Sequence, residues 1–180
     1  MIPDWNVVAT VQEHSFRHAW DFLLAYGAVA RTDYFNVITL RVADTGAFLE
    51  QLRRDLAADA AAAAALARAV PVTTAFGFQS PREFEAAARR AVTPWLSELA
   101  GCTFHVRMHR RGFKGRLSSQ DEERFLDHYV IEGLRRHGAD ASVSFDDPDI
   151  VIAVETVGQR GGVSRWARDQ RSRYPFLGLD

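Results

Sequence analysis

A basic segment near the middle of the chain carries the residue types best suited to binding a polyanion. Gly101 to Arg116 contains no acidic residue. Guanidinium forks match pairs of phosphate oxygens, glycines let a backbone approach a ligand closely, and an aromatic ring offers a face on which a base can stack. The segment therefore predicts RNA contacts from Arg107, His109, Arg110, Arg111, Phe113, Lys114 and Arg116.

The same residues have a structural interpretation, which the sequence leaves open. The arginines could pair with the acidic cluster Asp121–Glu123 and serve only the fold. The C-terminal stretch Gly158 to Arg173 poses the same choice, since it holds several arginines and one acid, Asp169. It predicts either a C-terminal helix with Trp166 packed inward or a second phosphate-contacting surface made by Arg160, Arg165 and Arg168.

A group of carboxylates is the alternative place for chemistry. Asp146, Asp147, Asp149 and Glu155 would suit acid–base catalysis or Mg²⁺ binding. However, Asp147-Pro148-Asp149 is typical of a turn that leads into the apolar run after it.

Other signatures of catalysis or metal binding are missing. The GxGxxG, P-loop and GxSxG motifs do not occur. His105 and His109 flank the cation Arg107 on one strand, which disfavours a metal ion between them. Cys102 is the one cysteine, so the chain has no internal disulfide or cysteine cluster. These patterns predict no cofactor, no metal and no catalytic residue.

Composition limits the class of protein further. The 180 residues are 47% hydrophobic and carry a net charge of −1, so nucleic-acid affinity must come from local clustering of charge. The N-terminus lacks the pattern of a signal peptide, and no apolar run approaches the ~20 residues that span a bilayer. We therefore expect a cytoplasmic protein without membrane or DNA contacts.

The first 79 residues have the periodicity of a split βαβ unit. Strands are predicted at residues 4–11, near Val29, at 34–42 and at 71–78. Helices are predicted from Phe16 to the stop at Gly27, and from Asp44 or Thr45 through the alanine run. This order is the ferredoxin-like βαββαβ arrangement. The fold class is thus α/β (α+β), with a ferredoxin-like N-terminal domain at 1–79.

A second unit is predicted at residues 80–180. Ser80-Pro81-Arg82-Glu83 and Ser119 with Glu122 resemble capping boxes that open two helices. Alternation predicts strands at 103–109 and 141–145, and the continuous apolar run 150–154 predicts a strand buried on both faces. Residues 158–162 are expected to form a loop.

Several blocks of this second unit resemble a known family. The stretch Phe104 to Lys114, followed by Leu117-Ser118-Ser119, resembles the core of a THUMP domain. Further blocks resemble the THUMP proteins that act as tRNA-binding adaptors for cytidine acetylation: Asp147-Pro148-Asp149, Val154 to Gly158, Ser164-Arg165-Trp166 and Arg173 to Leu177. The resemblance covers roughly residues 80 to 180.

The resemblance implies a function as well as a fold. It implies binding of tRNA at the acceptor-stem end and a separate acetyltransferase-like partner enzyme. Because the chain stops at Asp180, where related enzymes continue into a catalytic domain, we expect a non-catalytic adaptor. Two alternatives stay open: a small enzyme that uses the carboxylates near Asp149, and a ferredoxin-like module that binds a regulatory metabolite.

Overall fold

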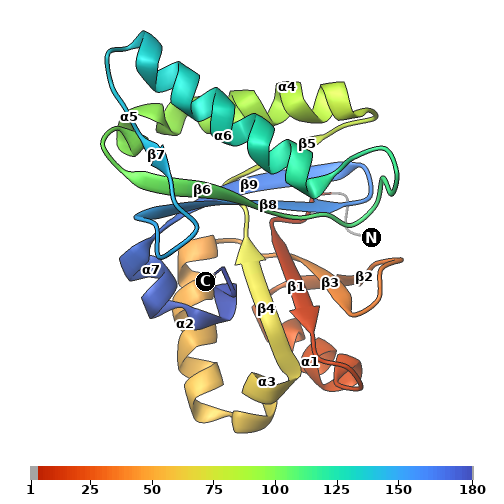
Figure 1. Cartoon of the computed structure of the whole chain (residues 1–180). Coiled ribbons are helices and arrows are strands. Elements are labelled where there is room, and N and C mark those ends of the chain that lie inside the picture. The colour runs from red at the N-terminus through yellow and green to blue at the C-terminus, as the bar shows by residue number, and fades with distance from the viewer. Residues whose placement is uncertain (1–3, 180) are drawn as a thin grey trace. The chain divides into compact units, whose positions relative to one another are not determined.

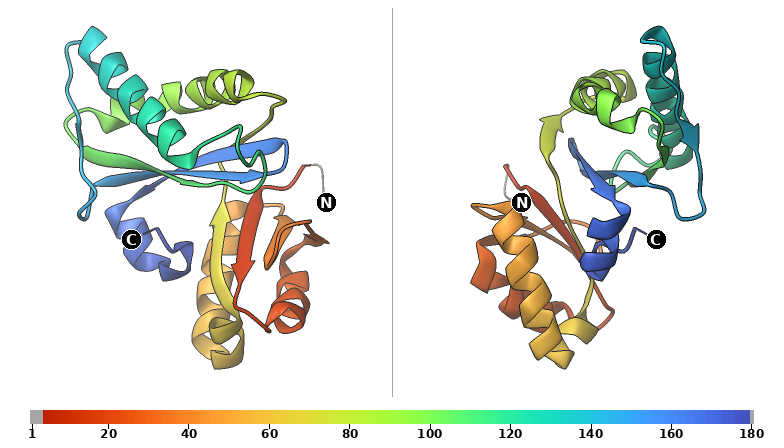
Figure 2. Two further views of the ribbon diagram at one scale, coloured as in Figure 1. Left: turned by 45° about the vertical axis from the view of Figure 1, so that its right-hand side comes forward. Right: turned by 90° about the vertical axis from the view of Figure 1, so that its left-hand side faces the viewer.

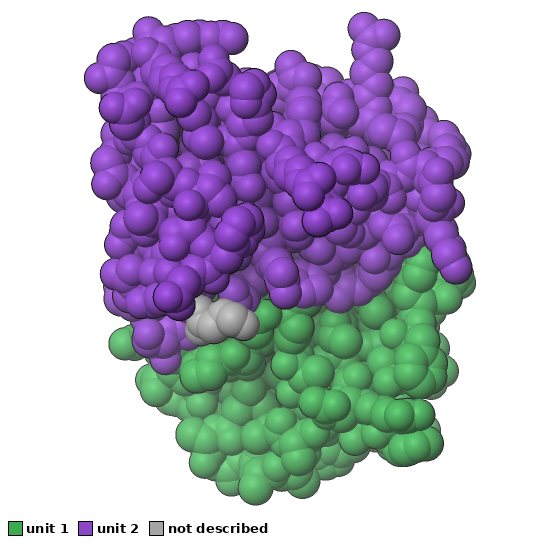
Figure 3. Space-filling view, in the orientation of Figure 1, with its two compact units in different colours: residues 1–71, 173–178 green, residues 72–172, 179–180 purple. Residues whose placement is uncertain are grey.

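The computed structural model describes residues 4–179 and forms two compact units. Of these residues, 4–71 and 173–178 form the N-terminal unit, and 72–172 and 179 form the C-terminal unit (Figure 3). Among the described residues, no helix is long and apolar enough to cross a membrane.

The N-terminal unit is a four-stranded antiparallel sheet with the strand order β2-β3-β1-β4. Its core comes from the strands and from buried side chains of the helices, such as Leu23, Phe48 and Leu52. The chain order and the strand order together form the expected ferredoxin-like arrangement. Its elements are β1 (Val7–Val11), α1 (Phe16–Leu23), η1 (Leu24–Tyr26), β2 (Ala28–Arg31), β3 (Val37–Arg41), α2 (Thr45–Ala58), α3 (Ala60–Ala65) and β4 (Leu66–Pro71).

The fourth strand lies earlier than the sequence predicted. Asp59 caps α3 by accepting hydrogen bonds from the amides of Ala61 and Ala62, so the alanine run forms its own short helix. β4 follows it directly, whereas residues 74–77 of the expected strand form β5 in the other sheet. The compact units consequently divide between Pro71 and Val72, where the sequence suggested a boundary after residue 79.

The C-terminal unit contains a five-stranded mixed sheet with the order β5-β9-β8-β6-β7. Helices α4 and α6 pack on one face of it (Figures 1 and 2), where Phe84, Leu126 and Val130 meet Phe104, Val106 and Ile152 of the strands. The elements are β5 (Thr74–Gly77), α4 (Pro81–Val92), η2 (Thr93–Trp95), α5 (Leu96–Leu99), β6 (Thr103–His109), α6 (Ser119–Arg136), β7 (Ser142–Val143), β8 (Ile150–Val157), β9 (Arg160–Ala167) and α7 (Arg168–Arg173). The last element, η3 (Pro175–Leu177), belongs to the N-terminal unit.

Capping residues explain where the two long helices of this unit begin. At α4, the Ser80 hydroxyl accepts from the Glu83 amide at 3.2 Å, and the Glu83 carboxylate accepts from the Gln79 amide at 2.8 Å. At α6, the predicted capping box is wrong. Ser118, not Ser119, is the N-cap, and its hydroxyl accepts from the Asp121 amide at 3.3 Å. Glu122 is buried instead of reaching back over the helix end.

The last strand, β9, was not predicted. Its glycines suggested a loop, but a Cβ on Gly161 would lie 2.8 Å from the Phe76 ring, and one on Gly162 would lie 2.7 Å from Val72. Glycine is needed here because the neighbouring segment approaches closely. By contrast, β8 is buried along its whole length, as its apolar sequence predicted.

Candidate nucleic-acid interface

Successive side chains of strand β6 point to opposite faces of the sheet. Phe104, Val106 and Met108 enter the core beneath α4 and α6, and Arg107, between them, is exposed. His105 is only 8% exposed, and its Nδ1 lies 2.9 Å from the Ser144 carbonyl oxygen. Within residues 4–179, no group of three or more His, Cys, Asp or Glu side chains could hold a metal ion.

The loop after β6 is a tight turn in the left-handed region of backbone space. Gly112, Phe113 and Gly115 have φ values of 104°, 53° and 76°. The Phe113 carbonyl accepts from the amides of Arg116 and Leu117 at 2.9 and 3.0 Å. A Cβ on Gly115 would meet no atom within 4 Å, so glycine is required there by its φ angle alone. This turn leads the basic segment directly to the start of α6.

Phe113 does not offer the free ring that base stacking needs. Its centroid lies 4.9 Å from that of Phe78, at the edge of the hydrophobic core. The Arg116 guanidinium lies over the ring, 4.8 Å from its centroid. The ring of Phe113 therefore holds the loop against the core.

Arg111 is also engaged in contacts within the protein. Its guanidinium is paired with Glu155, whose side chain is 1% exposed, while the Arg111 side chain is 12% exposed. The Arg111 backbone amide donates to Thr156 Oγ1 at 3.0 Å, and its carbonyl accepts from the Gly158 amide at 2.8 Å. His109 Nδ1 lies 3.6 Å from the same carboxylate. Arg111 therefore neutralises a buried acid at the end of β8, and His109 lies beside the same carboxylate.

The remaining cations of the segment differ from Arg111. Arg107, Lys114 and Arg116 are exposed, and Arg110 is half-buried and donates to the Gly112 carbonyl. Throughout the described chain, none of these four forms an ion pair with a carboxylate. The predicted alternative, pairing with Asp121–Glu123, is thus not what the structure contains. Glu123 accepts instead from the Met108 amide at 2.7 Å.

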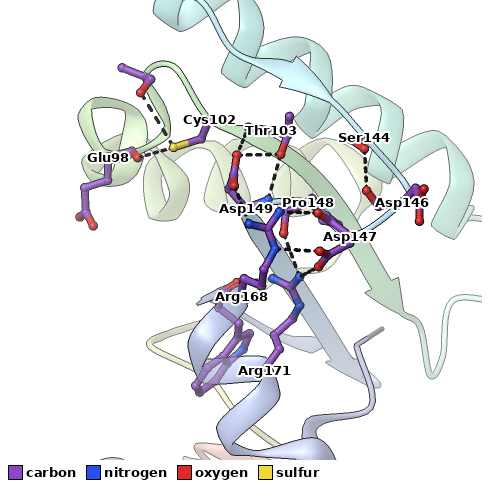
Figure 4. Close-up of polar contacts among 12 residues, drawn as sticks. Glu98, Cys102, Thr103, Ser144, Asp146, Asp147, Pro148, Asp149, Arg168 and Arg171 are labelled. Atoms are coloured by element: carbon purple, nitrogen blue, oxygen red, sulfur yellow. Dashed lines mark hydrogen bonds and ion pairs between the residues drawn. The ribbon is translucent and has the colours of Figure 1, made fainter.

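The C-terminal arginines are mostly engaged with acids. Arg165 pairs with Glu98, and Arg168 lies 2.9 Å from an Asp147 oxygen and 3.1 Å from an Asp149 oxygen. Figure 4 shows Arg168 and Arg171 directed at the turn that contains Asp147. Arg160 is half-buried on β9. Trp166 lies inward as predicted, but on a strand. Arg165 and Arg168 are therefore less available to phosphate than Arg107 and Lys114.

Asp149, the alternative catalytic residue, has a structural role. It accepts from the Thr103 amide and the Thr103 hydroxyl, both at 2.8 Å, and it faces Arg168 (Figure 4). These contacts, the Thr103 amide first, hold the pKa of Asp149 below its usual range. The carboxylate joins β6 to the start of β8.

An exposed aromatic residue was missed by the sequence reasoning. Alternation along residues 141–145 predicted a half-buried Phe145, but β7 ends at Val143 and Phe145 is 80% exposed. Its ring centroid lies 5.4 Å from that of His105. No local pattern distinguishes it from a buried strand residue, because exposure here depends on where the strand pairing stops.

Several solved structures have a similar fold. PH1313 from Pyrococcus horikoshii matches with a TM-score of 0.61 and 13% identity over 91% of this chain and 55% of that chain. A 4-thiouridine synthetase in complex with RNA and ATP matches at 0.54, with 13% identity over 91% of this chain and 42% of that one. TrmN from Thermus thermophilus matches at 0.57, with 17% identity over 89% and 44%.

These matches define the fold of the chain. The chain spans about half or less of the length of each protein. No family model matches the sequence, and no curated protein sequence matches it either. The predicted class, a ferredoxin-like unit followed by a THUMP-like unit, is confirmed by the architecture.

The expectation that the chain is not an enzyme is wrong. Structures with this fold include the 4-thiouridine synthetase, which is an enzyme, and SMU.472, a proposed methyltransferase that is complexed with SAH. The expectation rested on the missing cofactor and catalytic motifs and on the length of the chain, which covers 42% and 40% of those two proteins. Length was therefore no basis for separating this chain from catalytic proteins.

Proposed function

We propose that this chain binds tRNA at its acceptor-stem end and takes part in tRNA modification, with residues 80–180 as its THUMP part. The observation that carries the proposal is the set of exposed cations on β6 and the following turn: Arg107, Lys114 and Arg116 lack carboxylate partners in the described chain. Unpaired cations at fixed positions are what a phosphate backbone requires. The RNA complex of a 4-thiouridine synthetase with the same fold supports this choice of ligand.

The structure also revises which side chains we assign to the RNA. Phe145 replaces Phe113 as the candidate for base contact, because the Phe145 side chain is 80% exposed. Its ring lies beside His105, which is on the same strand as Arg107. Arg110 stays in the proposed site as a half-buried donor. The sequence resemblance supports cytidine acetylation as the modification and an acetyltransferase-like enzyme as the partner.

The test is the triple substitution of Arg107, Lys114 and Arg116 by alanine. We expect tRNA binding to weaken with little dependence on sequence, and the log–log salt slope to flatten by roughly 0.7 to 0.9 per lost contact, or about 2 to 3 in all. Fluorescence anisotropy with labelled tRNA between low and moderate salt measures both quantities.

A matched control removes three exposed arginines elsewhere. Alanine at Arg54, Arg90 and Arg136, all exposed on helices, changes the net charge equally. If both triple variants lose the same affinity and salt slope, binding is a nonspecific charge effect and the proposed site is wrong.

A further inference from the structure

A pocket of about 480 Å³ lies where the basic turn meets the N-terminus of α6. Its polar lining comes from Arg110, Arg116, Ser118, Ser119, Asp121 and Glu122. The first amides of a helix have no intrahelical acceptor, and the Ser118 hydroxyl satisfies only the amide of Asp121. The pocket therefore combines two guanidinium groups with the positive end of an 18-residue helix.

Two buried polar atoms of this lining lack partners within the described residues. They are Arg110 Nε and Glu122 Oε2. Glu122 is 5% exposed and lines the pocket. Buried polar groups without partners are uncommon and call for a ligand or an ordered water. A ligand with several polar atoms would satisfy both the donor and the carboxyl oxygen.

The carboxyl of Glu122 is in surroundings that disfavour its charge. Burial first, then the negative charges of Glu85 on α4 and Asp121 on α6, raise its pKa to about 7. The positive groups of the pocket, Arg110 and Arg116, lie on the turn side. Near neutral pH a large fraction of Glu122 is a neutral acid, which donates a hydrogen bond as well as accepting one.

We propose that this pocket binds a phosphate group, held by Arg110, Arg116, the first amides of α6 and the neutral acid of Glu122. This inference rests on the proposed function, in which the phosphate belongs to RNA. It assigns to the pocket one phosphate, either a terminal 5′-phosphate or an internal phosphodiester. Ionised Glu122 repels the phosphate and cannot donate to it, so the affinity falls as the pH rises through neutrality.

The first test is the pH dependence of binding by wild type and Glu122→Gln. The probe is an acceptor-stem minihelix with a 5′-phosphate, measured by anisotropy at pH 6 and pH 8. From pH 6 to 8 we expect wild type to lose about tenfold in affinity relative to Glu122→Gln, because a group of pKa near 7 is mostly ionised by pH 8. Titration of the phosphate itself is common to both proteins and cancels in the ratio.

Asp140→Asn is the matched control, because it removes the same charge from an exposed residue that does not line the pocket. We expect it to lose as much affinity as wild type between pH 6 and pH 8. If Glu122→Gln and Asp140→Asn give the same ratio between pH 6 and 8, the pocket inference is overturned. Phosphatase treatment of the minihelix then identifies which phosphate the pocket binds. Loss of the Glu122 pH effect indicates the terminal 5′-phosphate, and its retention indicates an internal phosphodiester.

The second test separates this inference from the proposed function. Inorganic phosphate is titrated into ¹⁵N-labelled protein, and we expect saturable shifts of the Ser119 and Gln120 amides in wild type but not in Arg110→Ala. Phosphate-dependent shifts without tRNA binding would contradict the proposed function and support the phosphate pocket. Normal tRNA binding without those shifts, and without the Glu122 pH effect, would contradict the phosphate pocket and support the proposed function.

Discussion

At the scale of single residues, burial separates two roles within one run of arginines. Arg107 is exposed and lacks a carboxylate partner in the described chain, whereas Arg111, a few positions on, pairs with the buried Glu155. An exposed cation keeps its interaction with water until an anion replaces it. A buried pair is held by mutual attraction, and removing one member leaves an uncompensated charge.

Arg111→Ala should therefore reduce stability far more than Arg107→Ala. We expect a loss of about 3 to 5 kcal/mol for Arg111→Ala, the typical cost of breaking a buried pair, against less than about 0.5 kcal/mol for the exposed site. Urea unfolding followed by circular dichroism measures both. Adding Glu155→Gln to Arg111→Ala should recover part of the loss, and no recovery would show that the buried charge is not the cause.

Asp127 should make stability depend on pH. Burial raises its pKa to about 7, although the hydrogen bond from the Val106 amide, at 3.0 Å, partly offsets this, and the charge of Glu123 adds to it. Between about pH 4 and pH 7 the folded state holds a proton that the unfolded state has released, so stability falls as pH rises over that window. The slope approaches about 1.4 kcal/mol per pH unit for one such group.

The measurement is the free energy of unfolding from pH 4 to pH 8 for wild type and Asp127→Asn. The asparagine keeps an oxygen that can accept from Val106 and carries no charge, so the decline should become shallower. Glu122 shifts in the same direction, and part of the slope should remain. An unchanged profile in Asp127→Asn would show that this carboxyl does not titrate as proposed.

At the scale of elements, α6 closes the open edge of β6. β7 pairs only with Thr103 and Phe104, so the amides farther along β6 lack a strand partner on that side. Asp127 and Glu123, one helical turn apart, accept from the Val106 and Met108 amides at 3.0 and 2.7 Å. Carboxylates of a helix thereby protect an edge that could otherwise pair with another chain.

Helix α4 depends on its N-cap in a way that a single substitution tests. Ser80→Ala removes the acceptor of the Glu83 amide and should cost about 1 kcal/mol. Ser97→Ala, at an exposed position of α5, is the comparison and should change stability by less than about 0.5 kcal/mol. Chemical denaturation gives both values, and equal effects would argue against a capping role for Ser80.

At the scale of the molecule, a segment near the C-terminus of the chain is part of the N-terminal unit. Residues 173–178 belong to that unit, where Arg173 Nε lies 2.7 Å from Glu50 and Arg68 Nε donates to the Leu177 carbonyl at 3.1 Å. The Arg173 and Tyr174 contacts lower the pKa of Glu50 to about 2. The ferredoxin-like unit is therefore completed by a segment from the far end of the sequence.

Leu177→Ala should consequently weaken the N-terminal unit more than the C-terminal unit. Leu177 is 1% exposed and contacts β4, so its truncation leaves a cavity that costs about 2 to 4 kcal/mol. Hydrogen exchange should show lost protection mainly in residues 7–71. Leu134→Ala, in the other core, should affect residues 103–157 instead. The same loss across both units in each variant would mean that the units do not unfold separately.

The sequence by itself determined the elements whose signals are local. Alternation identified β6, a continuous apolar run identified β8, and Ser80 with Glu83 marked the start of α4. The βαββαβ order followed from the same kind of pattern, as did the basic segment on β6 and the turn after it. These features depend on neighbours within a few residues, which is why periodicity and capping chemistry reveal them.

Only the tertiary structure decided which strands pair and which charges are buried. The local pattern of residues 74–77 also fits the last strand of the first sheet. In the structure these residues pair with β9, because Gly161 and Gly162 permit their close approach. Arg111 and Lys114 are both cations of the same basic segment, but only Arg111 pairs with the buried carboxylate of Glu155, 44 residues away. Strand partners and buried ion pairs depend on contacts between distant segments, and local residue patterns do not encode those distances.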